Sequence, residues 1–235
     1  MKHLLAYAFC AAAFVAVPPA NAAAQPAPPS VEHTLRAVRI ETSEAPVIDG
    51  DLSDAVWAKG AVIDRLLQVN PNAGEDGSER TVLRVLYDEN NLYFSVYCYD
   101  KEPDQIVIRA RARDGAQNQG DYIRLYLDPG TTRRDGYAFD VGASGGRADG
   151  LLQDNVSFLN TWNTIWEARS RVVADGWVAE IAIPFRSLSY DPSRDSWGFD
   201  FSRNIRRKGE TDRWTSDTPT IANTDISEAG TLTGL

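Results

Sequence analysis

Histidine is almost missing from this 235-residue chain, and its scarcity excludes several kinds of catalytic site. The two histidines are His3 and His33, both near the N-terminus. A Ser-His-Asp hydrolase needs a histidine base within the fold, and a structural zinc site needs clustered His and Cys ligands. These residues cannot assemble either one. The sequence also lacks a glycine-rich loop in front of a helical segment, so no phosphate cradle is predicted.

Cysteine and long apolar runs are scarce as well. The two cysteines are Cys10 and Cys98, and Cys10 lies in the apolar run from Leu4 to Val17. That run is too short to span a bilayer comfortably. With a basic start and small residues before the cleavage point, it predicts a secretory signal peptide over residues 1–22. A retained membrane anchor is the alternative. Removal of the signal leaves Cys98 alone, so no internal disulfide is expected.

The rest of the sequence predicts a single acidic domain. Residues 23–32 are a Pro/Ala spacer that we expect to be disordered, and residues 33–235 form the domain. The chain has 24 basic and 33 acidic residues, for a net charge of −9. We therefore expect no nucleic acid and no anionic membrane surface as a partner. Export would place the protein in the periplasm, at the outer membrane or outside the cell.

Alternating apolar and polar residues dominate the domain. In Thr81–Asp100, two β-rich runs flank a polar turn at 88–91, and the second run predicts one apolar face made by Leu92, Phe94, Val96 and Cys98. Similar runs occur at 121–130, 135–155, 166–185 and 196–207. No segment with helical periodicity and length separates them. The pattern predicts an all-β fold, an antiparallel β-sandwich.

The stretch "VIDGDLSDAVW", residues 47–57, predicts one short N-terminal helix. Asp51 would cap it, Asp54 would lie in its first turn and Gly60 would end it. A calcium loop of the EF-hand kind starting at Asp49 needs a glycine at its sixth position and a glutamate at its twelfth, where the chain has Asp54 and Gly60. Acids on one turn cannot flank a substrate as a catalytic pair. Capping is therefore favoured over metal ligation.

Short motifs follow one another along the domain: "APVIDGDLSDAVW", "VLRVLYDENNLYFSVYCYD", "GDYIRLYLDP", "DGWVAEIAIPFRSL", "WGFDFSRNIRR" and "SEAGTLTGL". Together they resemble family 9 carbohydrate-binding modules, especially the module at the N-terminus of exported bacterial proteins with a long C-terminal β-barrel-like region of unknown function. The resemblance implies a carbohydrate-binding-module-like sandwich that binds sugar at one end, with structural calcium in some members. Because the chain ends on an apparent strand, we expect a missing C-terminal barrel that would associate with the outer membrane.

The resemblance also indicates where sugar would bind. In well-understood members, two tryptophans clamp a terminal sugar ring. The matching positions fall near Asn118 and Asn223, and neither is aromatic. Asp121 opens the strand next to the first position. These three residues are candidate ligand contacts, but sugar rings usually bind to aromatic faces, so the familiar clamp is not expected here.

Two of the six tryptophans are further candidates for the site. Trp162, in the polar stretch "NTWNTIW", suits a binding platform about as well as a buried loop anchor. Trp214, in "ETDRWTSD", is open to both interpretations. The remaining tryptophans lie within strand or helix patterns and are assigned to the core: Trp57, Trp166, Trp177 and Trp197.

Arginines are the other candidate feature. Arg109, Arg111 and Arg113 alternate with alanines in "IVIRARARD", and a strand there would place them on one face. Further arginines follow in "FSRNIRRKGETDRW": Arg203, Arg206, Arg207 and Arg213. If the two segments are neighbours, they form a positive groove for carboxylate- or sulfate-bearing glycans, with Arg111 and Arg113 as binding residues. The favoured alternative is a solvated face with salt bridges to Asp121, Asp140 and Glu180.

These features favour non-catalytic glycan recognition by an exported module. No pair of carboxylates stands out as a glycosidase site, so no enzyme is predicted. The main alternative is a structural or docking domain, in the periplasm, of an outer-membrane β-barrel protein. A module associated with a glycoside hydrolase is a third interpretation.

Overall fold

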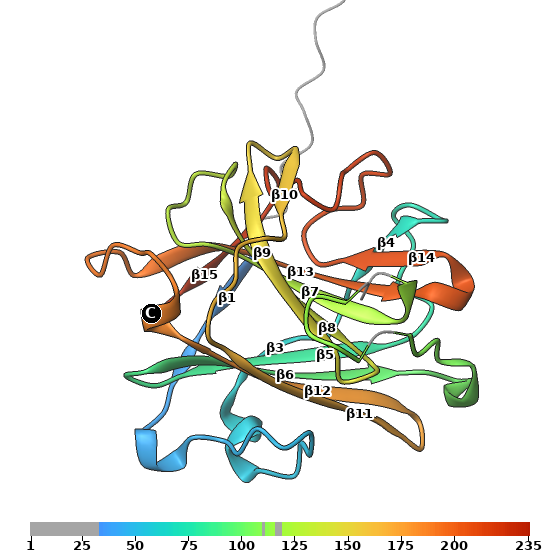
Figure 1. Ribbon diagram of the computed structural model, residues 1–235, viewed down its shortest axis with the longest axis horizontal. Helices are drawn as coiled ribbons and strands as arrows, with labels where there is room; N and C mark the ends of the chain where they lie inside the picture. The colour runs from blue at the N-terminus through green and yellow to red at the C-terminus, as the bar shows by residue number, and fades with distance from the viewer. Residues whose placement is uncertain (1–32, 110, 116–118) are drawn as a thin grey trace, which may run out of the picture. The chain divides into compact units, whose positions relative to one another are not determined.

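The computed structural model describes residues 33–109, 111–115 and 119–235, which form two β-sheets facing each other (Figure 1). The predicted signal peptide and spacer, residues 1–32, lie outside the described residues. The strands are β1 Thr34–Arg36, β2 Val38–Arg39, β3 Ala61–Ile63, β4 Leu67–Asn70, β5 Thr81–Tyr87, β6 Asn91–Tyr99, β7 Tyr122–Asp128, β8 Gly136–Gly142, β9 Arg147–Gln153, β10 Ser157–Leu159, β11 Glu167–Val173, β12 Gly176–Pro184, β13 Ser196–Ile205, β14 Glu210–Arg213 and β15 Gly230–Thr233.

The predicted β-sandwich is confirmed. The first sheet runs β1-β15-β13-β7-β8-β9-β10, and β14 joins it to β4. The second runs β11-β12-β6-β5-β2, with β3 also paired to β5. Most pairs are antiparallel, but β1 with β15 and β2 with β5 are parallel. The predicted hairpins form as β5–β6, β8–β9 and β11–β12.

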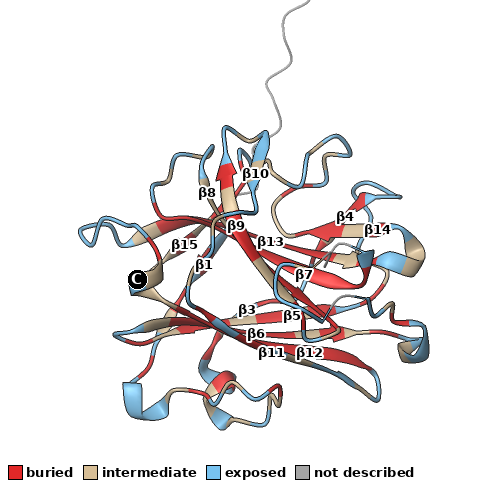
Figure 2. Cartoon of the chain, viewed as in Figure 1, coloured by how far each residue is buried: buried red, intermediate tan, exposed pale blue. Residues whose placement is uncertain are grey.

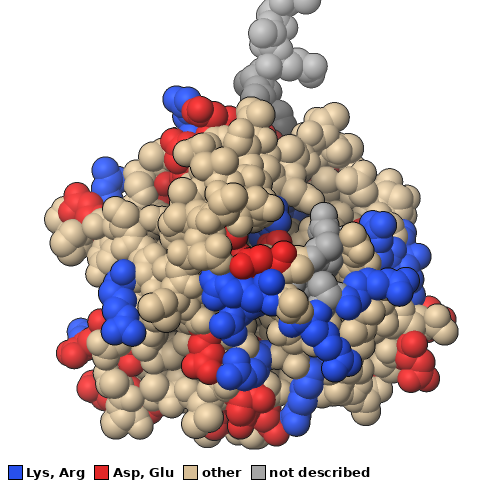
Figure 3. Space-filling model, in the orientation of Figure 1, with Lys and Arg blue, Asp and Glu red and all other residues tan. Residues whose placement is uncertain are grey.

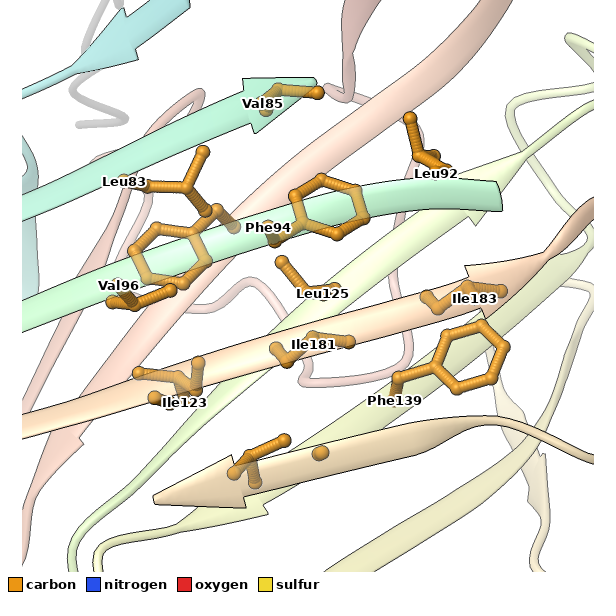
Figure 4. Packing of buried hydrophobic residues seen from close by; sticks show 14 of the residues in the cluster. Leu83, Val85, Leu92, Phe94, Val96, Ile123, Leu125, Phe139, Ile181 and Ile183 are labelled. Atoms are coloured by element: carbon orange, nitrogen blue, oxygen red, sulfur yellow. The ribbon is translucent and has the colours of Figure 1, made fainter. Parts of the chain in front are cut away.

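Side chains from both sheets meet in one core (Figures 2 and 4). Leu92, Phe94, Val96 and Cys98 are all 0% exposed, so the predicted apolar face of β6 is confirmed. Phe94 stacks at 5.7 Å on Phe199 of β13 in the opposite sheet. Each fully buried side chain of this size contributes roughly 1.5–3 kcal/mol. Cys98 is the one cysteine among the described residues and is free, so the core is the main stabilising feature there.

The 47–57 segment folds against the outer face of β12. The carboxylate of Glu180, which is 0% exposed, accepts hydrogen bonds from the backbone N–H groups of Asp49 (3.0 Å) and Gly50 (2.8 Å). It also accepts one from Trp57 Nε1 at 2.9 Å. Gly50 has a φ of 87°, which favours glycine at this turn. One buried carboxylate therefore fixes the entry of the chain into the sandwich.

The predicted helix capped by Asp51 is not found. The segment instead forms a short 3₁₀ helix, η2 Ala55–Lys59, whose C-cap is Gly60. Asp51 accepts from the N–H of Ser53 in a local turn, and Asp54 accepts from the N–H of Val47 at 2.8 Å. The bonds to Glu180 hold Asp49 and Gly50 in the turn before this segment, and the helical residues begin at Ala55. The other 3₁₀ turns are η1 Thr42–Glu44, η3 Pro103–Gln105, η5 Phe185–Ser187 and η6 Arg206–Lys208. Within the described ranges, no helix has the length and apolar character to cross a membrane.

Candidate functional site

Two of the predicted site residues are close in the structure, because Arg113 donates hydrogen bonds to the loop that carries Trp162. Trp162 is half-buried, with ring centroids 5.1 Å from Tyr137 and 6.5 Å from Phe139. The next residue, Asn163, accepts a hydrogen bond from Arg113 Nε at 3.1 Å. Trp162 therefore packs mainly as a loop anchor against β8, with part of its ring left accessible.

Trp214 and Asp121 both have structural contacts. Trp214 is half-buried, at 5.3 Å from the ring of His33 and 5.7 Å from that of Phe199. Asp121 is 2% exposed, and its Oδ1 accepts from the N–H of Arg206 at 3.1 Å. Burial is the main cause that raises the pKa of Asp121. In these positions, the two side chains fix neighbouring segments and face no hollow described below.

The positions matched to the family's sugar clamp do not form a described site. Asn118 lies outside the described residues. Asn223 is exposed, and its carbonyl oxygen accepts from Arg124 Nη1 at 3.0 Å. Arg111, another candidate, is exposed in an irregular segment.

The predicted arginine groove is wrong. The segment with Arg109 and Arg113 is not a strand in its described residues, so their side chains do not share a pleated face. Arg203 is 0% exposed because β13 points it inward, where its guanidinium donates to Tyr99 O at 2.8 Å and Thr81 Oγ1 at 3.0 Å.

The alternative interpretation, a solvated face with salt bridges to Asp121, Asp140 and Glu180, is also wrong about these partners. Arg213 is 2% exposed and forms an ion pair with Asp200, while Asp140 receives two hydrogen bonds from Arg124, at 2.6 and 2.7 Å. Glu180 binds the entry segment. The alternation along β13, which puts Arg203 on the same face as Phe199 and Phe201, is the sequence signal that the expected groove overlooked.

An unpredicted feature is a small hollow lined by aromatic rings. It has a volume of about 220 Å³, and its lining includes Tyr87, Phe185, Tyr190 and Trp197. Tyr190 is 39% exposed, and its ring lies 5.4 Å from Trp197 and 5.8 Å from Phe185. We call this the aromatic hollow. Its rim carries charged groups of both signs: Arg39, Asp88, Glu89 and Arg194.

A larger hollow of about 720 Å³ adjoins the aromatic hollow through their shared lining residues Glu89, Phe185 and Tyr190. It leads to a third hollow of about 510 Å³, with which it shares Asn91, Pro184 and Arg186. The third, which we call the arginine hollow, is also lined by Arg147 and Arg169. We call the three neighbouring hollows together the end groove; residues at the start of β6 and the end of β12 line two of them.

The groove offers the groups that sugar recognition needs. Tyr190 presents part of an aromatic face, and amide and guanidinium donors lie on either side of it. The carboxylate of Asp88 is already engaged: Oδ1 accepts from the N–H groups of Asn90 (2.7 Å) and Asn91 (2.8 Å), and Oδ2 accepts from Tyr93. The groove can therefore hold a polar sugar ring, and the carboxylate of Asp88 holds the adjacent turn in place.

The sequence signal for this site was a tyrosine in a polar loop. Tyr190 stands in "SLSYDPSRDSW", between the strands now seen as β12 and β13. An aromatic side chain among Ser, Asp, Pro and Arg is a sign of surface exposure, as it was for Trp162. Residues distant in sequence complete the hollow: Tyr87 at the end of β5, the turn residues Asp88 and Glu89, Arg39 and Leu235.

Calcium was implied by the family resemblance. Among residues 33–109, 111–115 and 119–235, no three His, Cys, Asp or Glu side chains are placed to hold a metal ion. The aspartates of the entry segment are engaged in other contacts: Asp54 accepts from Val47, and Asp51 forms an ion pair with Arg171 at 2.8 Å. No metal ligand set follows from these contacts.

Comparison with known sequences gives a family match over most of the chain. The model of the "Carbohydrate family 9 binding domain-like" family matches residues 48–233. The matched range begins in the entry segment and ends in β15, so it includes strands of both sheets. No curated protein is significantly similar in sequence to this chain.

Solved structures share the fold at low sequence identity. A proposed carbohydrate-binding protein from Bacteroides uniformis is 9% identical, with a TM-score of 0.71 over 86% of this chain and 99% of that one. A family 9 carbohydrate-binding module from Caldicellulosiruptor kristjanssonii in complex with glucose is 18% identical, with a TM-score of 0.60 over 86% and 95%. Its complex with cellotriose is 19% identical, with a TM-score of 0.57 over 84% and 92%.

Proposed function

Because the chain belongs to the carbohydrate family 9 binding domain-like family, we propose that residues 33–235 bind carbohydrate without catalysing a reaction. The family match over residues 48–233 is the observation that carries this proposal. The module from Caldicellulosiruptor kristjanssonii is seen with glucose and cellotriose, which supports a glycan as the ligand class. The predicted signal peptide supports a place of action outside the cytoplasm.

We place the binding site in the end groove. The family's clamp positions carry asparagines in this chain, so an aromatic stacking face must come from another element. Tyr190 can supply one, since the residue is 39% exposed and its ring lies next to Trp197 and Phe185. A ring held by two others loses little conformational freedom when a sugar stacks on it.

The charged groups at this end suit binding better than hydrolysis. A glycosidase needs two carboxyl groups on opposite sides of the scissile bond, about 5–10 Å apart. In the aromatic hollow, Asp88 and Glu89 are neighbours in sequence, and Glu89 lies 3.6 Å from Arg39. Asp88 accepts three hydrogen bonds from its own turn and from Tyr93. Both groups are therefore suited to positioning a ligand.

A glycan array with the purified protein tests this proposal. We expect binding to at least one oligosaccharide class, and no new reducing ends after prolonged incubation with the bound glycan. A correctly folded protein that binds no neutral or acidic glycan would overturn it and favour the docking role. Release of reducing ends would replace binding with catalysis.

A further inference from the structure

The arginine hollow is a positively charged site on an acidic protein. The whole chain has a net charge of −9, yet the charged lining residues of this hollow are Arg147, Arg169, Arg186 and a single carboxylate, Glu167. In the same orientation as Figure 1, Figure 3 shows Lys and Arg side chains gathered on the face that carries β11. Such a local excess of positive charge attracts anions.

Arg147 is the least compensated of these residues. Its Nε is buried without a hydrogen-bond partner, and its guanidinium lies 5.6 Å from the ring centroid of Trp166. Among the ion pairs of the described residues, none involves Arg147 or Arg186. Burial, followed by the nearby charges of Arg113 and Arg169, lowers the pKa of Arg147. An anion in the hollow would relieve this repulsion.

In contrast to Arg147, two arginines elsewhere in the fold are paired with carboxylates. Arg124 binds Asp140 through two hydrogen bonds, and Arg207 binds Asp100 at 2.6 and 2.8 Å. In the hollow, the one ion pair joins Arg169 to Glu167 at 3.2 Å, with both side chains about half exposed. Exposed pairs of this kind are weak, so Arg169 remains available to a ligand.

The walls of the hollow suit a sugar ring that carries the anion. Ile165 is 72% exposed beside the arginines, and Ile48 and Pro184 also line the hollow. An acidic pyranose has an apolar C–H face for such a wall and a carboxylate or sulfate for a guanidinium fork. The hollow beside it shares Asn91, Pro184 and Arg186 with the arginine hollow and is itself lined by Tyr190, so an oligosaccharide bound at the arginines could extend towards this ring.

We propose that the end groove selects oligosaccharides bearing carboxylate or sulfate groups, which bind at Arg147, Arg169 and Arg186. This inference rests on the proposed function and adds the class of glycan. The guanidiniums recognise the charge, and Tyr190 and the apolar wall recognise the sugar rings.

Calorimetric titration of the protein with three probes tests this inference: trigalacturonate, its neutral methyl ester and a sulfated carrageenan oligosaccharide. We expect at least one anionic probe to bind about tenfold or more tightly than the ester. The carboxylate and sulfate probes then show which of the two groups is preferred. Equal affinity for the acid and the ester, with no binding of the sulfated probe, would overturn the selectivity while the proposed function stands.

Matched variants locate the binding. Arg186→Gln changes an exposed residue that has no ion pair, and Arg147→Gln changes the one packed over Trp166. Each should weaken anionic binding about tenfold, whereas Arg134→Gln, whose partner Asp154 is a surface residue, should not. An equal loss in all three variants, or no loss in Arg186→Gln, would contradict the assignment. Equally tight binding of polyglutamate would also contradict it, because charge alone would then suffice.

Discussion

Replacing Asp212 with asparagine should remove a strong pH dependence of stability located in β14. The side chain is 0% exposed, and neither of its oxygens has a hydrogen-bond partner. Burial without a hydrogen-bond partner disfavours the charged carboxylate, and the charge of Glu210, which is itself 4% exposed, acts in the same direction. Both effects favour the protonated form of Asp212 in the folded protein.

The size and sign of the effect follow from the pKa. Burial first, and the charge of Glu210 second, raise the pKa of Asp212 from 3.8 to about 8. A folded-state pKa above the unfolded value gives stability that is complete below about pH 4 and is lost as the pH rises through about 8. One pKa unit corresponds to about 1.4 kcal/mol, so the total loss is on the order of 5 kcal/mol.

Urea unfolding followed by tryptophan fluorescence measures this effect. At pH 4, we expect Asp212→Asn and the unmodified protein to have similar free energies of unfolding. At pH 9, the asparagine variant should be more stable by a few kcal/mol. Asp76→Asn is the control, because Asp76 forms an exposed ion pair with Arg65 at 2.7 Å. A difference between Asp212→Asn and the unmodified protein that does not change with pH would refute the reasoning.

Two further substitutions test the structural assignments. Glu180→Ala should lower the free energy of unfolding by about 3 kcal/mol or more, because the donors of Asp49, Gly50 and Trp57 lose their buried acceptor. An unchanged urea midpoint would show that the entry segment is not fixed by this carboxylate. Trp162→Ala should cost about 1–2 kcal/mol of stability and leave glycan affinity unchanged, since the ring packs on Tyr137. A loss of affinity without a loss of stability would return Trp162 to the site.

The fold could be predicted because its signals are local. The alternation in β6 and the turn at 88–91 specify a hairpin with one buried face, and the structure has both. The conformation of residues 51–60, where a helix was predicted, could not be obtained from local signals. These residues suit a capped helix, but three hydrogen bonds to Glu180, more than 120 residues away, impose a different conformation.

The candidate site was harder to predict because it depends on which side chains are internal. Arg203 is fully buried and Arg111 is exposed. Alternation along β13 puts Arg203 on the same face as the core residues Phe199 and Phe201, but only the structure shows the oxygen atoms that accept from its guanidinium. Likewise, Arg147 and Arg169 come from different sheets and meet only where β9 passes β11. No spacing rule relates such residues.

The central claim, that the end groove binds carbohydrate, rests most directly on Tyr190. The measurement is a calorimetric titration of the best-bound array oligosaccharide into the unmodified protein, Tyr190→Ala and the control Tyr99→Ala, whose ring stacks on Tyr97 outside the groove. We predict at least a tenfold loss of affinity for Tyr190→Ala, about 1.4 kcal/mol, with Tyr99→Ala unchanged. Equal affinity in Tyr190→Ala and the unmodified protein would contradict the account.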